Sequence, residues 1–122
     1  MKRALLPIIL CLTAASAWTQ TTTPGAAPAP KRFLIEREIP GASQMTPEQM
    51  REGAAKSNKV LRDLGTDIQW VHSYVAGDKI YCVYTAPSEE LIRQHAQLSG
   101  FPADKITPVA AVLDPTTAGS KR

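Results

Sequence analysis

The stretch "WVHSYVAGDKIYCVY", residues 70–84, predicts a β-hairpin at the centre of the fold. Two runs rich in Trp, Tyr and Val flank an Ala-Gly-Asp segment, which is the pattern of two strands joined by a tight turn. The hairpin places a histidine, His72, and a cysteine, Cys82, on facing strands. Whether these two side chains share a face of the sheet depends on the length of the turn.

The turn can close in two ways that give opposite answers. A two-residue loop at 77–78 pairs His72 with Val83, and it then puts His72 and Cys82 on opposite faces. A three-residue loop at 76–78 shifts the register by one residue, so that His72 lies directly across from Cys82. Gly-Asp is compatible with either closure. The sequence therefore leaves open whether these two residues can form one site.

Four further segments surround the hairpin. The run "RFLIEREI" alternates in a strand pattern, with Phe33, Ile35 and Arg37 on one face and Glu36 on the other. Each of two amphipathic helices begins with a capping residue and ends at a glycine. A last strand contains Pro108, which cannot donate to a ladder and so predicts an edge or a bulge. The segments are a strand at 32–39, a helix within 46–65, a helix within 88–100 and a strand within 105–115.

The resulting order, β-α-β-β-α-β, predicts an α+β fold of the ferredoxin-like type. In this topology a four-stranded antiparallel sheet carries both helices on one face. The other face is then uncovered, and an exposed apolar sheet face predicts a partner. We expect a homodimer that packs sheet to sheet as a dimeric α/β barrel.

The chain is divided by composition into four parts. Residues 1–17 have a basic start, a short apolar run and an Ala-Ser-Ala end, which is the layout of a cleaved secretory signal peptide. Residues 18–31 form a Thr/Pro/Ala leader without hydrophobic periodicity, and residues 116–122 are similar, so both are predicted to be disordered. Residues 32–115 form the domain. We expect an exported protein, periplasmic or secreted, with membrane contact only if the signal segment stays uncleaved.

Removal of the signal peptide changes the charge and the cysteine count. The chain has 14 basic and 11 acidic residues, and the loss of Lys2 and Arg3 lowers the net charge from +3 to about +1. This balance, without a basic cluster, gives no support for nucleic-acid binding. Cys11 also leaves, so that Cys82 remains without a partner for an intramolecular disulfide.

Four residues are candidate metal ligands: His72, Cys82, His95 and Glu36. Imidazole and thiolate suit nickel, cobalt, copper and zinc. His95 follows Leu91 by four positions and so points inward, where it needs a hydrogen-bond partner or a metal. Glu36 faces the side of the sheet that the helices leave open, as a ligand, a general base or half of an ion pair. The competing interpretation is that the histidines and the cysteine are packing residues, because their spacing matches no compact metal motif.

Three segments together resemble a known family of small bacterial proteins: "FLIEREIPG", "WVHSYVAGDKIYCVYTAPSEELIRQHAQLSGFPADKI" and "VLDP". The family, formerly of unknown function, is that of nickel-responsive, nickel-binding proteins with a ferredoxin-like fold and an α/β-barrel dimer. The resemblance covers Phe33 to Pro115. It implies nickel as the metal, with His72, Cys82 and His95 as matching positions. The export signal and the Thr/Pro leader are additions to the family pattern.

The sequence thus predicts an exported, dimeric and non-catalytic binding protein for a divalent transition metal, with nickel favoured. It contains no nucleophile elbow, phosphate loop or dinucleotide fingerprint, and no catalytic or cofactor-binding residue is assigned. The alternative is a small-molecule binder or an enzyme of the dimeric α/β-barrel type that uses the cavity between the two sheets. In that case His72 or Glu36 would act as an acid or a base.

Overall fold

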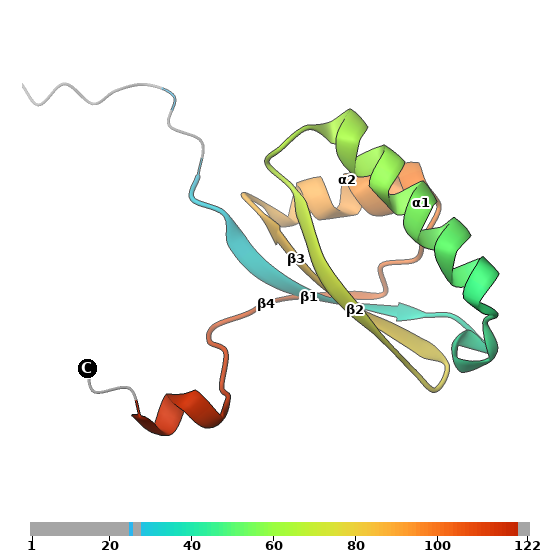
Figure 1. Cartoon of the computed structure of the whole chain (residues 1–122). Coiled ribbons are helices and arrows are strands. Elements are labelled where there is room, and N and C mark those ends of the chain that lie inside the picture. Colours follow the sequence, from blue (N-terminus) through green and yellow to red (C-terminus); the bar gives the residue numbers. More distant parts are fainter. Residues whose placement is uncertain (1–24, 26–27, 120–122) are drawn as a thin grey trace, which may run out of the picture.

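The order of elements in the structure is the predicted one (Figure 1). A computed structural model of the chain describes Gly25 and residues 28–119. The predicted signal peptide, residues 1–17, lies outside the described residues, as does most of the leader. The elements are β1 (Lys31–Glu38), α1 (Pro47–Leu64), β2 (Gln69–Ala76), β3 (Lys79–Ala86), α2 (Glu89–Ser99) and β4 (Lys105–Pro108), with short 3-10 helices η1 (Ala42–Gln44) and η2 (Pro115–Gly119).

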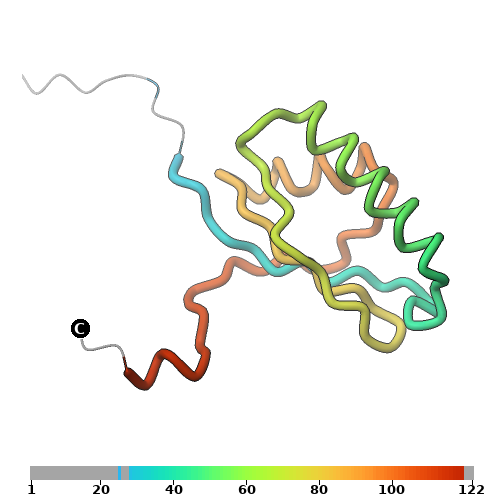
Figure 2. The backbone as a smooth tube through the Cα atoms, in the orientation of Figure 1, coloured from blue at the N-terminus to red at the C-terminus, as the bar shows by residue number. Residues whose placement is uncertain are grey.

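The four strands form one antiparallel sheet in the order β2-β3-β1-β4. Both helices lie on the same side of this sheet, and the opposite side carries no helix of the domain (Figure 1). The fold is therefore α+β and ferredoxin-like, as predicted. The path of the chain in Figure 2 shows the segment after β4 running away from the domain toward η2.

The hairpin closes with a two-residue loop. Ala76 pairs with Lys79, so only positions 77 and 78 lie between the strands, and Gly77 has a left-handed φ of 60°. The register then pairs His72 with Val83. His72 and Cys82 consequently lie on opposite faces of the sheet, which is the first of the two arrangements that the sequence left open.

Contacts from η1 and from the residues just before it, 39–41, fix this turn. The carboxylate of Asp78 accepts a hydrogen bond from the backbone N–H of Gly41 at 2.9 Å. The carbonyl of Gly77 accepts from both the hydroxyl and the backbone N–H of Ser43, at 2.7 and 3.1 Å. Ile39 adds a bond from its backbone N–H to the carbonyl of Asp78. The two-residue loop is therefore stabilised by a segment more than 30 residues away in sequence.

Both helices begin and end at the predicted signals. Thr46 and Gln49 form the capping box of α1, with Pro47 in the first turn, and the hydroxyl of Ser88 accepts from the third residue of α2. Gly100 ends α2 with a φ of 72°. Such caps satisfy backbone groups that a helix end leaves without a partner.

The C-terminal part of the chain departs from the predicted element bounds. The sequence predicts a strand up to residue 115, whereas β4 ends at Pro108 on the edge of the sheet. Proline has no N–H to continue the ladder. At the start of the predicted tail, residues 115–119 form η2, where the Asp114 carboxylate accepts from the N–H and hydroxyl of Thr116.

The core lies between the helices and the sheet. Alternate residues of β1 point into it, and Phe33, Ile35 and Arg37 are all at most 3% exposed. Seven buried residues form the central cluster: Phe33, Ile35, Ile68, Cys82, Tyr84, Ala86 and Ile92. The other side of the sheet bears Leu34, Glu36 and Glu38 on β1, as the alternation predicted.

Candidate metal ligands and a cavity beneath helix α1

The four predicted ligands are divided between the two faces of the sheet. Cys82 and His95 lie on the side of the helices, and both are buried, at 4% and 0% exposure. His72 and Glu36 lie on the side without helices, which we call the open face. Among the described residues, no group of three or more His, Cys, Asp or Glu side chains is placed to hold a metal ion. A single described chain therefore does not gather the four predicted ligands into one site.

Cys82 is a core thiol held by an arginine. Its Sγ accepts a hydrogen bond at 3.3 Å from Nε of Arg37, the residue two positions beyond its cross-strand neighbour Ile35. Nη1 of the same guanidinium donates to the carbonyl of Pro102, and its Cζ lies 5.8 Å from the ring centroid of Phe101. The sulfur of Cys82 thus accepts a hydrogen bond from a positively charged group. A metal ion at the sulfur would be repelled by that charge.

His95 belongs to a buried polar group on α1, β3 and α2. Its Nε2 is 3.1 Å from Oγ of Ser57, which is also 3.2 Å from the hydroxyl of Tyr84. The rings of Tyr84 and His95 are 5.2 Å apart. Within the described part of the chain, Nδ1 of His95 is buried without a hydrogen-bond partner. This group satisfies the expectation that an inward histidine needs a polar partner.

Burial changes the acid–base behaviour of this group. Desolvation, assisted by the charge of Arg37, lowers the pKa of His95 below its ordinary value. Desolvation also raises the pKa of Tyr84, although its hydrogen bond to Ser57 acts in the opposite direction. Both side chains are therefore neutral in the folded protein at neutral pH.

The lowered pKa of His95 predicts that the protein loses stability as the pH falls below about 6.5, the pKa of an unfolded histidine. The unfolded state then binds a proton that the folded state resists, so the free energy of unfolding rises with pH up to this value and levels off above it. Urea unfolding between pH 5 and 8 measures the effect. His95→Gln should flatten the dependence. An equal slope in wild type and His95→Gln would contradict the assignment.

The open face carries His72 beside an aromatic ring and Glu36 between two lysines. The ring of His72 meets that of Tyr74 edge-on at 4.9 Å. The carboxylate of Glu36 lies 3.6 Å from Nζ of Lys79 and 3.8 Å from Nζ of Lys105. Interaction with Tyr81, and then with Glu36, raises the pKa of Lys79. Glu36 is thus half of an ion-pair group, one of the roles the sequence allowed.

His72 and Glu36 do not meet within one chain. Strand β3 lies between them, and the residue level with His72 on β1 is Leu34, two positions before Glu36. Two strand spacings correspond to about 10 Å. Any metal ion that uses His72 must take its other ligands from elsewhere.

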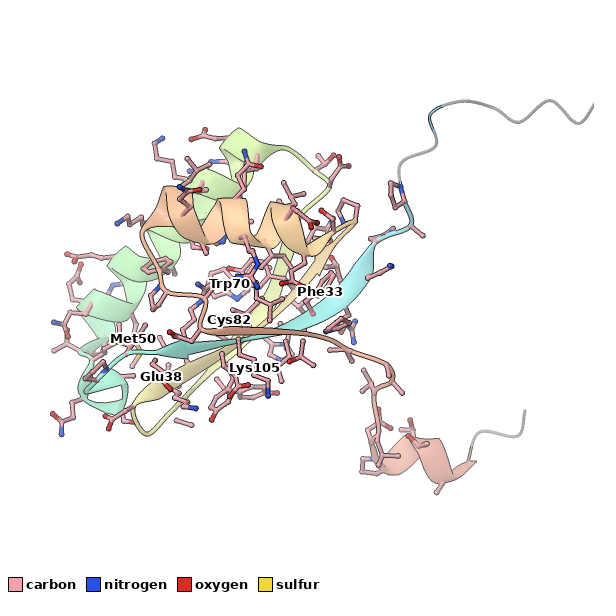
Figure 3. The ribbon with its side chains drawn as sticks, turned by 180° about the vertical axis from the view of Figure 1, so that it is seen from behind. Phe33, Glu38, Met50, Trp70, Cys82 and Lys105 are labelled. Atoms are coloured by element: carbon pink, nitrogen blue, oxygen red, sulfur yellow. The ribbon has the colours of Figure 1, made fainter. Side chains whose placement is uncertain are left out.

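A cavity of about 640 Å³, which the sequence pattern does not predict, lies between α1 and the sheet. Arg37, Ser57 and Tyr84 contribute polar groups to its lining, together with Cys82. Figure 3 shows Trp70 and Cys82 between the helices and the sheet, with Lys105 on the opposite side. The feature of the sequence that could have indicated this cavity is Arg37, a charged residue on the otherwise apolar face of β1. The remaining walls are formed largely by apolar residues, among them Met45, Met50, Ala54, Val75, Ile80 and Phe101.

The arrangement of strands and helices defines a ferredoxin-like α+β protein, and its sequence places it more closely. Residues 33–109, more than half of the chain, match the family described as "Nickel responsive protein SCO4226-like", and the protein belongs to this family. The resemblance seen in the sequence is thereby confirmed.

A solved structure supports the fold. The crystal structure of SCO4226 from Streptomyces coelicolor A3(2) is similar with a TM-score of 0.56 and 22% sequence identity, over 67% of this chain and 99% of that chain. At this identity the likeness concerns the fold alone. No curated protein is similar enough to count as a match. Among the described residues, no helix is long and apolar enough to cross a membrane.

Proposed function

We propose that the protein is an exported homodimer that binds a divalent transition metal, with nickel as the favoured ion, and that it catalyses no reaction. The observation that carries the proposal is the position of His72 on the open face, away from the core. We favour nickel because the family to which the chain belongs is described as nickel responsive. Imidazole is a suitable ligand for Ni²⁺.

His72 is the best ligand among the four predicted residues. Cys82 is bonded to Arg37, and His95 is enclosed with Ser57 in the core. Glu36 could release its lysines to bind a metal, but it lies two strands from His72. A second chain packed on the open face would bring its own histidine and carboxylate to the same region. A shared site between two chains therefore overcomes the distance that separates these ligands in one chain.

The composition of the open face supports a sheet-to-sheet dimer. Leu34 and Val83 are partly buried residues on its two central strands, and Tyr74 is 62% exposed beside them. Glu36 with Lys79 and Lys105 provides both signs of charge next to this apolar centre. A surface with both signs of charge around an apolar centre can be complementary to itself across a two-fold axis.

Calorimetric titration with Ni²⁺ of wild type and single variants tests the site. Because loss of even an outer-shell partner weakens metal sites by about 10–100-fold, His72→Ala should weaken binding by at least about 10-fold. Cys82→Ala is the matched control on the other face and should bind as wild type does. If His72→Ala binds nickel normally, the ligand assignment is wrong. Loss of nickel binding in Cys82→Ala would indicate that the metal site lies in the core. Parallel titrations with Zn²⁺ and Co²⁺ test the preference for nickel.

Export is tested by the N-terminus of the mature protein. The layout of residues 1–17 predicts cleavage before Trp18. Intact-mass analysis of protein recovered from the periplasm or the medium should give a chain that begins at Trp18. Recovery of the chain with residues 1–17 in the cytoplasmic fraction would contradict export.

A further inference from the structure

The cavity beneath α1 has a positive charge in its wall without a negative partner. Arg37 is only 3% exposed. None of the ion pairs among the described residues includes it. Its Nη2 is buried without an acceptor, although Nε and Nη1 donate to Cys82 and Pro102. A buried cation without a counterion is costly, and an anion placed near it removes part of that cost.

The carboxylates near the cavity do not supply this counterion. Glu38 contributes to the lining, but its side chain is 66% exposed and lies 3.8 Å from Nζ of Lys79 on the open face. Asp104 accepts from the backbone N–H of Glu38, and within the described part of the chain it forms no hydrogen bond or ion pair with Arg37. The field inside the cavity is therefore set by the guanidinium.

The rest of the cavity suits a hydrocarbon. Its volume of about 640 Å³ falls within the range of small-molecule sites, about 300–1,000 Å³. The walls are formed by the side chains of Met45, Trp70, Ile80 and Phe101 with their apolar neighbours. Met50, at 40% exposure, and Val75, at 38%, mark the side on which the cavity opens.

Two hydroxyl groups lie in the same wall. Ser57 and Tyr84, at 4% and 2% exposure, are bonded to each other, and the pKa of Tyr84 is raised. One of the two hydroxyl protons is used in the hydrogen bond between Ser57 and Tyr84, so at most one hydroxyl is left to donate to a ligand. A charged guanidinium with a neutral hydroxyl donor beside it can bind a carboxylate through charge-assisted hydrogen bonds.

We propose that this cavity is a binding site for a small monocarboxylate with an apolar tail, of the medium-chain fatty-acid type. The carboxylate lies toward Arg37 and the hydroxyls, and the tail lies along the apolar walls toward Met50 and Val75. The site is on the helix side of the sheet, so it is separate from the proposed nickel site and from the space between the sheets of a dimer. Binding here requires no metal ion.

The test compares decanoate with decanol, which has the same tail and no charge. Trp70 lines the cavity, so its fluorescence reports occupancy, and calorimetry with a chelator present gives the affinity. Wild type should bind decanoate at least about 10-fold more tightly than decanol, because only the carboxylate forms a charge-assisted contact with the guanidinium. Equal affinities for the two ligands, or no binding of either, would overturn the proposal.

Three variants locate the site. Arg37→Met removes the charge and should abolish the preference for decanoate, whereas Arg37→Lys should keep it. Ala54→Phe adds a large side chain to the wall of the cavity while the arginine is kept, and it should weaken the binding of both ligands by about 10-fold or more. If Arg37→Met fails to fold by circular dichroism, the wild-type comparison and Ala54→Phe still decide the matter. Full binding of decanoate by Ala54→Phe would place the ligand elsewhere and overturn the proposal.

Discussion

Replacing Ile92 by alanine is expected to lower the free energy of unfolding by about 2–5 kcal/mol, the usual cost of truncating a buried isoleucine. Ile92 is completely buried and joins α2 to the central cluster on the sheet. The domain is small, so this loss is a large part of its total stability. Urea unfolding of wild type and variant at pH 7.5 measures the difference.

Leu98→Ala is the matched control for this experiment. Leu98 lies on the same helix, but it is 57% exposed. Its truncation should change stability by no more than about 0.5 kcal/mol. If the two alanine variants were equally stable, α2 would not be anchored to the sheet through Ile92.

Val83→Lys is expected to convert the proposed dimer into a monomer. Val83 lies on the central strand β3, level with His72 on one side and Leu34 on the other. A sheet-to-sheet dimer would bury a new lysine from each chain near its axis, so that two like charges without partners are desolvated together. The dimer dissociation constant should rise by at least about 100-fold, which corresponds to about 2.7 kcal/mol.

The control for this change is Leu98→Lys, which adds the same charge on the outer surface of α2. Analytical ultracentrifugation over a range of concentrations should find Leu98→Lys dimeric and Val83→Lys monomeric. Nickel affinity should fall together with the dimer, since the proposed site draws ligands from both chains. A Val83→Lys protein that remains dimeric would show that the open face is not the interface.

Most of the fold could be predicted because its signals are local. The alternation of Phe33, Ile35 and Arg37 indicates one face of a strand, and the capping box at Thr46 fixes the start of α1. These signals act within a few residues, so they are present in the sequence regardless of the final packing. Their order was sufficient to give the ferredoxin-like topology.

The register of the hairpin could not be predicted because distant contacts determine it. Gly77 and Asp78 fit either loop, and the hydrogen bonds that hold the two-residue form come from Gly41 and Ser43. Nothing in residues 70–84 indicates these partners. Because of that register, His72 and Cys82 lie on opposite faces of the sheet.

The sequence predicted which residues are candidate ligands, but it did not predict how they are arranged in space. The inward direction of His95 follows from helical periodicity and agrees with its complete burial. Its hydrogen bond to Ser57 joins two helices, a contact that periodicity alone does not reveal. Arg37 was assigned to the correct face, yet the cavity beside it depends on how far α1 lies from the sheet.

The most direct test of the central claim is the position of nickel in crystals grown with Ni²⁺, located by anomalous diffraction at the nickel absorption edge. The proposal predicts a peak on the open face, bound to the imidazole of His72 and enclosed by the sheets of two chains. A peak at Cys82 or His95 on the helix side, or a nickel-soaked crystal without a bound ion at His72, would contradict it.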